Sequence, residues 1–256
     1  MLRRIVKISK YFRLDSVFQH KLLFVMYNTY MASSTHKLNW LRASVLGAND
    51  GIVSIEGLVL GVAGATDSAT VILTAGVAGI VAGAISMAAG EYVSVSSSRD
   101  TEKAILEKER YNLENFPERE LKELTLIYRE KGLSEKTSEL VAKELSKKDV
   151  LAAHAHMELN IDPNNLTNPW HAAFASSGAF LAGAMIPLIA IIIPPAAIKV
   201  PVAFISVIIA LAITGILSAK AGGASVKRAT VRVVLGGALA MTVTYFIGKL
   251  FAVSGI

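Results

Sequence analysis

Metal-capable side chains follow one face of a long apolar segment in the first half of the chain. Gly79, Gly83, Met87 and Glu91 recur every four residues, so a continuous helix places them in one stripe. The glycines permit close helix contact, and the thioether and carboxylate that follow can ligate a metal ion. No proline interrupts the segment as it passes from apolar to highly charged by Glu102. The stripe therefore suggests an ion pathway that leaves a membrane and enters a carboxylate-rich region.

A second set of polar side chains lies in the apolar segment at residues 41–65. Asn49, Asp50 and Glu56 stand in a run long enough to cross a bilayer, where a central acid costs on the order of 2.5–3.5 kcal/mol. Asn49 and Glu56 share a helix face that Asp50 does not. A buried polar pair that only fixes helix packing is one interpretation. We favour a functional site, because intramembrane acids persist where they face protein, water or a bound cation.

Carboxylates and imidazoles are concentrated in the charged segment at residues 99–163. Glu120 and Glu123 lie one turn apart, and His154 and Glu158 are spaced i and i+4, so each pair can face one cation. Carboxylates suit hard divalent cations, and imidazole adds affinity for Fe(II), Mn(II) or Zn(II). A solvated helix face is the plainer explanation for any single glutamate, so only the cluster indicates metal binding. The candidates are Glu102, Glu107, Glu109, Glu114, Glu118, Glu120, Glu123, His154, His156 and Glu158.

Several other chemistries lack their signatures. Cysteine is absent, which excludes disulfides, thiolate nucleophiles and cysteine-based zinc or iron–sulfur sites. The sequence contains no Glu-x-x-His pair for a ferritin-like di-iron centre, and no Gly-rich phosphate loop or nucleophile elbow. It also lacks an aromatic and basic pattern for stacking nucleic-acid bases. We therefore expect no enzyme, no nucleic-acid partner and no permanently bound cofactor.

Apolar helices must position these residues. The chain of 256 residues is 53% hydrophobic and 18% charged, with a mean hydropathy of +0.49, which is too apolar for a soluble domain of this size. Residues 99–163 hold 27 of the 46 charged residues. The pattern predicts an all-α polytopic membrane protein with five transmembrane helices and a three-helix cytoplasmic insert between the second and third spans. The predicted spans cover about residues 41–65, 71–92, 170–193, 202–219 and 233–253.

The insert divides into three predicted helices. The first, residues 99–115, continues the second span; the second runs from Pro117 to Lys131 and ends before Gly132; and the third is capped by Ser134 and reaches Leu159. Their apolar faces carry Leu121, Leu124 and Tyr128 on the second helix and Leu140, Val141 and Leu145 on the third. The predicted divisions of the chain are a basic N-terminal extension at 1–37, the first two spans at 38–98, the metal-binding insert at 99–163 and the last three spans at 168–256.

The distribution of basic residues predicts the orientation. Residues 1–42 hold eight basic residues and one acid, and they fall on the same side as the insert and a basic loop at 220–232. The loops at 66–69 and 194–201 carry only one basic residue, Lys199, so the N-terminus and the insert should be cytoplasmic and the C-terminus outside or lumenal. Residues 1–35 are a targeting segment, a membrane-surface helix or sequence upstream of a start at Met31. We favour one of the last two.

Two motifs resemble the vacuolar iron transporter family. Residues 41–53, LRASVLGANDGIV, match its first-span motif, and residues 86–95, SMAAGEYVSV, resemble its second-span motif. Asn168, Pro169 and Trp170 before an alanine-rich span also fit. The similarity covers about residues 38–256. It implies a five-span homodimer with a three-helix metal-binding domain that exports Fe(II), often with Mn(II), by proton antiport.

The resemblance also implies roles for particular residues. Asp50 and Met87 match positions along the family's transport path, and we place Glu91 on the same path. Glu109, Glu120, Glu123 and Glu158 match carboxylates of its metal-loading domain, and His154 lies where that domain offers another ligand. Family members commonly have a second carboxylate one turn after Glu109, where this chain has Asn112, an uncharged oxygen ligand. Glu56 has no family role.

The expected function is transport of Fe(II), and also Mn(II), out of the cytosol in exchange for protons. The partners would be divalent metal ions, protons, the lipid bilayer and a second copy of the chain. A Mn(II)-selective exporter is one alternative, and a membrane metal buffer or sensor that does not translocate is another. We expect the bacterial inner membrane, with a vacuole-type membrane as the alternative.

Overall fold

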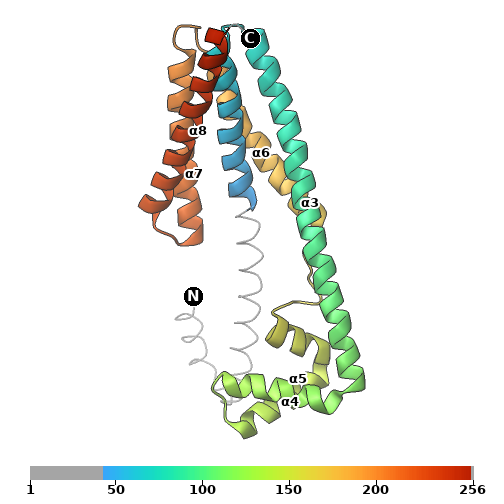
Figure 1. Cartoon of the computed structure of the whole chain (residues 1–256). Helices are drawn as coiled ribbons and strands as arrows, with labels where there is room; N and C mark the ends of the chain where they lie inside the picture. Colours follow the sequence, from blue (N-terminus) through green and yellow to red (C-terminus); the bar gives the residue numbers. More distant parts are fainter. Residues whose placement is uncertain (1–42, 255–256) are drawn as a thin grey trace, which may run out of the picture. The chain divides into compact units, whose positions relative to one another are not determined.

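The computed structural model describes residues 43–254, and every regular element among them is a helix (Figure 1). The predictions for the basic N-terminal extension and for a start at Met31 lie outside the described residues. Five helices are long and apolar enough to cross a membrane, so the predicted all-α, five-span fold class is confirmed. They are the first span (Ala43–Ala65), α3 (Ala69–Asn115), α6 (Pro169–Ile192), α7 (Lys199–Gly222) and α8 (Val226–Ser254).

Helix α3 runs without a break from the second span into the insert, as predicted. Ser68 caps its first turn by accepting a hydrogen bond from the backbone N–H of Val71. Its 47 residues extend about 70 Å at 1.5 Å per residue, whereas about 20 residues cross a bilayer. The Tyr92 ring lies 4.7 Å from the ring of Trp170 at the start of α6, and such aromatic groups mark the membrane interface. The part of α3 beyond Tyr92 therefore lies outside the bilayer.

Small residues bring the first span into close contact with α6 and α8. A Cβ atom added at Gly47 would lie 2.6 Å from the carbonyl oxygen of Ser176 on α6, and one at Gly64 would lie 2.6 Å from that of Tyr245 on α8. Only glycine permits this approach of backbones. Phe180 of α6 places its backbone against Gly51 of the first span and its ring against Gly83 of α3. The close helix contact predicted for Gly83 agrees with the structure.

Helices α7 and α8 are longer at their N-terminal ends than the sequence predicted. We expected a turn through Pro201 and a loop through Arg232, but α7 begins at Lys199 and α8 at Val226, after Gly223 with φ of 66°. A helix tolerates Pro201 in its first turn because that N–H needs no partner within the helix. Basic side chains in the first turns of α8 can extend into water without interrupting the helix.

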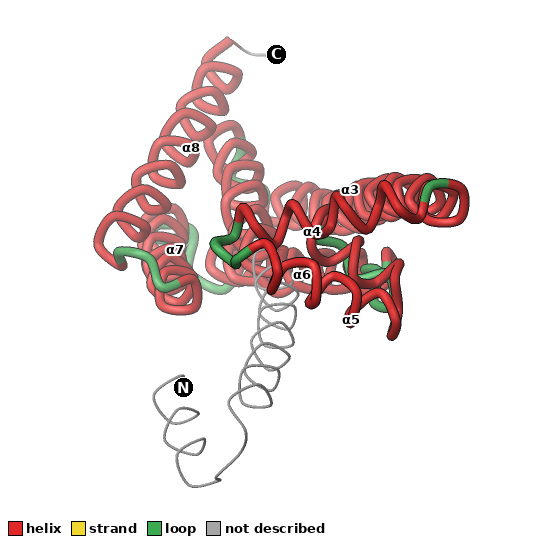
Figure 2. The backbone as a smooth tube through the Cα atoms, turned by 90° about the horizontal axis from the view of Figure 1, so that it is seen from below, coloured by secondary structure: helices red, strands yellow, loops and turns green. Residues whose placement is uncertain are grey.

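The insert is completed by α4 (Pro117–Glu130), α5 (Glu135–His154) and the π-helix η1 (Ala155–Leu159) (Figure 2). Ser134 caps α5 as predicted, accepting from the backbone N–H of Thr137, and Gly132 takes a φ of 96° after α4. The insert has its own small core of buried Leu124, Tyr128, Ala142 and Ala153. The prediction that Leu140 faces this core is wrong, since Leu140 is 59% exposed.

The predicted continuous third helix is also wrong in two places. Asp149 has the non-helical angles φ −161° and ψ 98°, and its carboxylate accepts a 2.9 Å hydrogen bond from the backbone N–H of Ala152. The aspartate therefore acts as an N-cap that restarts the helix. The helix then widens into the five-residue π-turn η1. The kink at Asp149 lies five residues before His154, and η1 begins directly after it.

Candidate metal-loading and transport sites

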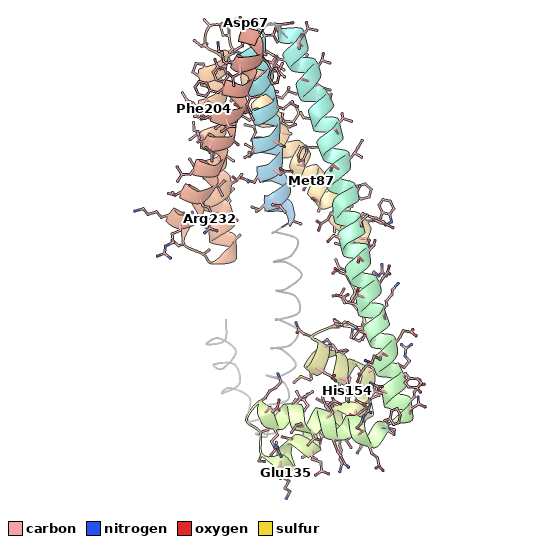
Figure 3. The ribbon with its side chains drawn as sticks, in the orientation of Figure 1. Asp67, Met87, Glu135, His154, Phe204 and Arg232 are labelled. Atoms are coloured by element: carbon pink, nitrogen blue, oxygen red, sulfur yellow. The ribbon has the colours of Figure 1, made fainter. Side chains whose placement is uncertain are left out.

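Three buried side chains from three helices converge in the insert. Glu109 comes from the end of α3, Glu120 from the first turn of α4 and His154 from the end of α5, and one ligand atom from each lies within 4.8 Å of the others. Their exposed fractions are 5%, 2% and 0%. Metal–ligand bonds of about 2.0–2.2 Å place the ligands of one ion at such separations after small side-chain movements. The group, which Figure 3 marks by its His154, can therefore hold one divalent cation.

His154 presents unsatisfied nitrogen atoms to this group. Its Nδ1 lies 3.0 Å from Oε1 of Glu109 and 3.7 Å from Oε2 of Glu158. Within the described chain, however, neither ring nitrogen of His154 nor Oε1 of Glu109 has a partner with hydrogen-bond geometry. Buried polar atoms are nearly always hydrogen-bonded. Atoms that approach each other without bonding are arranged to share a third partner, and a metal ion fits that role.

Burial and mutual repulsion disfavour the ionised form of the carboxyl groups in the metal-free site. Burial raises the pKa of Glu109, and together with the nearby carboxylates Glu158, Glu120 and Glu123 and against the opposing effect of Arg119 it brings that pKa to about 7. The pKa of Glu158 is raised by burial and by Glu123, with His154 acting in the opposite direction. A bound divalent cation would offset both effects. The arrangement therefore suits a divalent cation, which would compete with protons for these carboxylates near neutral pH.

Arg119 already neutralises part of the cluster. Its Nη2 and Nε donate hydrogen bonds of 2.7 and 3.1 Å to Oε1 of Glu120, and its guanidinium lies 4.7 Å from the centre of the Phe116 ring. The side chain of Arg119 is 59% exposed, so it can move away when a metal arrives. The sequence analysis missed this residue because an arginine next to a glutamate is ordinary on a charged helix.

The remaining predicted insert ligands surround this group. Glu158 lies on η1 with its side chain 29% exposed, and π-turns often occur at functional sites. Glu123 is exposed, but its charge acts on both Glu109 and Glu158. Asn112 is half-buried, and its backbone carbonyl accepts a 2.7 Å hydrogen bond from the N–H of Phe116. The ligand roles of Glu123, Glu158 and Asn112 remain predictions.

The proposed transport-path residues are divided between two helices. Asp50 is exposed on the first span, whereas Met87 and Glu91 are half-buried on α3. Met87 packs against the bundle core (Figure 3). Phe180 contacts Gly51, which follows Asp50, and Gly83, one turn before Met87. Within residues 43–254, no hydrogen bond or ion pair joins Asp50 to Glu91. One chain therefore leaves this site open on the side of Asp50.

The exposed stripe around Asp50 is amphipathic. Leu46, Asp50, Ser54 and Leu58 recur every four residues and are all exposed, the two leucines by 61% and 38%. Ser54 donates its hydroxyl hydrogen bond back to the carbonyl of Asp50. A carboxylate flanked by leucines is costly against lipid. The stripe is therefore better suited to contact with another protein surface than to contact with lipid or with water alone.

The similarity to known proteins extends over both the insert and the spans. The model of the VIT family matches residues 41–249. A vacuolar iron transporter from Acanthamoeba castellanii is 45% identical over 212 residues, which are 82% of this chain and 78% of that protein. Vacuolar iron transporter homolog 1 from Oryza sativa subsp. japonica is 36% identical over 221 residues, 86% of this chain and 77% of the relative. Vacuolar iron transporter homolog 2.1 from Arabidopsis thaliana is 35% identical over 214 residues, 83% and 82% of the two chains.

Proposed function

Because this chain belongs to the VIT family, we propose that it moves Fe(II), and also Mn(II), out of the cytosol in exchange for protons. It is a multi-pass membrane protein and a metal transporter, not an enzyme. The relatives reported above are named for iron. Mn(II) is added because carboxylate and imidazole ligands accept both ions.

The buried group of Glu109, Glu120 and His154 carries the proposal. Cytosolic metal is captured there, because three converging ligands with unsatisfied atoms bind a divalent cation more strongly than any solvated glutamate. The insert therefore acts as the loading domain, on the cytoplasmic side that the basic residues indicate. The membrane is that of a vacuole-type compartment or the bacterial inner membrane.

Transfer from the insert to the bilayer follows α3. Glu91 stands 18 residues before Glu109 on the same unbroken helix, which corresponds to about 27 Å. Metal passes Glu91 and Met87 and reaches Asp50, where a carboxylate replaces part of its hydration shell. One carboxylate at each step of this path binds the ion weakly enough to release it.

A second copy of the chain completes this path. The stripe of Leu46, Asp50, Ser54 and Leu58 is exposed, and burying it against the same stripe of another copy removes the carboxylate from lipid. Asp50 of each chain then lines a passage between two subunits. The exposed apolar surfaces of the spans are otherwise suited to lipid.

Protons take the place of the metal on the return. The pKa of Glu109 near 7 means that metal capture at neutral pH displaces a proton from the insert. The carboxylates along the path exchange ions in the same way, so no nucleotide is needed to drive export.

The experiment is Fe(II) uptake into proteoliposomes that contain the full chain. We expect time-dependent accumulation that Mn(II) inhibits by competition. A Mn(II)-selective exporter would accumulate Mn(II) and ignore Fe(II). A metal buffer or sensor would bind stoichiometric metal at the insert but give no accumulation, and that result would refute the transport proposal.

A further inference from the structure

Glu56 is a buried acid that the proposed metal path does not use. Its exposed fraction is 0%, and neither carboxylate oxygen has a hydrogen-bond partner among the described residues. On the same face of the first span, Val53 lies 3.6 Å from the position of a Cβ added at Gly237 of α8, and Leu60 lines an apolar pocket with Met241. Glu56 stands between them, so it faces the bundle core where the first span meets α7 and α8.

No cation compensates this carboxyl group. No ion pair within the described residues includes Glu56, and Lys199 at the start of α7 is instead 3.2 Å from Oδ1 of Asp67. Other titratable groups are at the helix ends or, like Tyr245, a turn beyond the level of Glu56. An isolated carboxylate in such surroundings is strongly disfavoured, so Glu56 carries its carboxyl group as the neutral acid. The charged or titratable residues of the packed helices α7, α8, α6 and α3 nearest the core are Lys199, Lys220, Lys227, Arg228, Arg232, Tyr245, Lys249, His171 and Glu91.

Two more buried oxygen atoms without partners lie on the way to Glu56. They are Oδ1 of Asn49 and Oγ1 of Thr230, again counting the described residues. Asn49 precedes Glu56 by seven residues and shares its helix face, about 10 Å away. Thr230 lies against Gly215 of α7 and seven residues before Gly237, so it faces the same seam nearer the connection between α7 and α8. The three side chains therefore form a row of polar groups that leads from that connection into the core.

This row lies on a different side of the first span from the exposed stripe around Asp50. Glu56 follows Asp50 by six residues, which turns its side chain about 120° around the helix. Asp50 is exposed, whereas Glu56 is fully buried. The two acids therefore cannot meet the same ion in this conformation.

We propose that Glu56 is a proton-binding site on a route that runs between the first span, α7 and α8, separate from the metal path at Asp50 and Met87. The carboxyl group keeps its proton while the helices are packed and loses it to water that enters along Asn49 and Thr230 when they separate. In this step the O–H bond of the acid breaks, and the proton passes to a water molecule. The role of Glu56 in transport rests on the proton exchange of the proposed function. That Glu56 holds a proton does not depend on that exchange.

The first test measures the proton directly. Infrared spectra of the full-length protein in lipid nanodiscs at neutral pH are compared between the wild type and each variant. The wild type should show a carboxylic-acid C=O band that disappears in Glu56→Gln and in Glu56→Leu. The matched control Glu139→Gln removes an acid whose side chain is 54% exposed and should leave the band unchanged. Identical spectra for the wild type and both Glu56 variants would overturn the proposal.

The second test measures coupling in proteoliposomes. We expect Glu56→Gln to keep binding metal at the insert and to move about one proton fewer per chain for each transported ion, while Glu139→Gln keeps the wild-type ratio. Glu56→Leu guards against a folding artefact, since an apolar side chain of similar size removes an unsatisfied polar group. An unchanged proton ratio in both Glu56 variants would refute the coupled route. If wild-type protein moves metal without protons, the exchange mechanism under "Proposed function" fails, and the infrared band alone decides whether Glu56 holds a proton.

Discussion

The acids of the insert and the acids of the spans are arranged in opposite ways. In the insert, Glu109 and Glu120 converge with His154 from three helices, and Arg119 compensates part of their charge. In the spans, Asp50 and Glu56 stand alone on separate faces of one helix. Clustered ligands favour strong and selective binding, whereas a single carboxylate favours release. The difference therefore separates capture of the ion from its passage.

The same comparison explains how each region tolerates its acids. The insert raises the pKa of Glu109 and Glu158 and offers a cation site. The bundle instead exposes Asp50 on a stripe that a second copy can cover and buries Glu56 as an isolated group. We propose that a cation stabilises the first arrangement, and that subunit contact or a proton stabilises the second.

Asp50→Asn should have the largest effect, because it breaks the transport path and spares the insert. Removing the one carboxylate charge that holds the ion within the spans should lower Fe(II) uptake by about 100-fold or more, which corresponds to about 2.8 kcal/mol or more. Calorimetric metal binding by the insert should stay at the wild-type level. Asp67→Asn, whose side chain is 93% exposed, is the control. Normal uptake by Asp50→Asn would remove this residue from the path.

His154→Ala and Glu109→Gln should break the other side of the comparison. Loss of a group next to a metal ligand typically costs about 10- to 100-fold in affinity, and loss of a ligand should cost at least that. Titration calorimetry with Mn(II), which resists oxidation, measures the change. Uptake should fall mainly at low metal concentration, because Asp50 is intact. Unchanged affinity in both variants, with the exposed Glu139→Gln as the control, would show that the buried group is not the loading site.

The pH dependence should distinguish the insert from a solvated acidic surface. Since the pKa of Glu109 is about 7 in the metal-free site, metal affinity should fall by up to about 10-fold for each pH unit below 7. The folded metal-free insert binds more protons than the unfolded chain between about pH 4.5 and 7, so its stability should decrease as the pH rises through this range. Calorimetry in buffers of different ionisation enthalpy should detect the released proton. A pH-independent affinity across this range would contradict the buried site.

Arg119→Gln should have the smallest effect and should sharpen the comparison. The arginine is 59% exposed and bonded to Glu120, and such pairs contribute about 0.2–1 kcal/mol. Removing this competing cation should raise metal affinity by about 2- to 5-fold, measured by the same calorimetry. A lower affinity would instead mean that Arg119 positions Glu120 for the metal.

Periodicity and motif spacing predicted most of the architecture, but not the local geometry around His154. The continuous α3, the N-cap at Ser134 and the glycine contacts follow from local rules that a sequence displays. The kink at Asp149 and the π-turn η1 do not, because their cost is offset by contacts with other helices. Ligands from the ends of three helices come together only through that tertiary packing. The starts of α7 and α8 were misjudged because proline and basic residues were taken as loop signals although the first turn of a helix accepts both.

The burial of Glu56 was also beyond sequence reasoning. The periodicity placed it on a face with Asn49, but only the packing of α7 and α8 shows that this face is the bundle core. Periodicity also placed Asp50 on a different face from Glu56. Only the positions of the neighbouring helices show that the face of Asp50 is exposed and that of Glu56 is buried.

Metal-dependent proton movement in proteoliposomes tests the division between capture and passage most directly. Vesicles containing the full chain and a lumenal pH dye receive Fe(II), Mn(II) or Zn(II) in turn, with Asp50→Asn vesicles measured in parallel. Proton efflux should accompany Fe(II) and Mn(II) entry in the wild type and be lost in Asp50→Asn, which still binds metal at its insert. Metal binding without any metal-driven proton movement in the wild type would contradict the account.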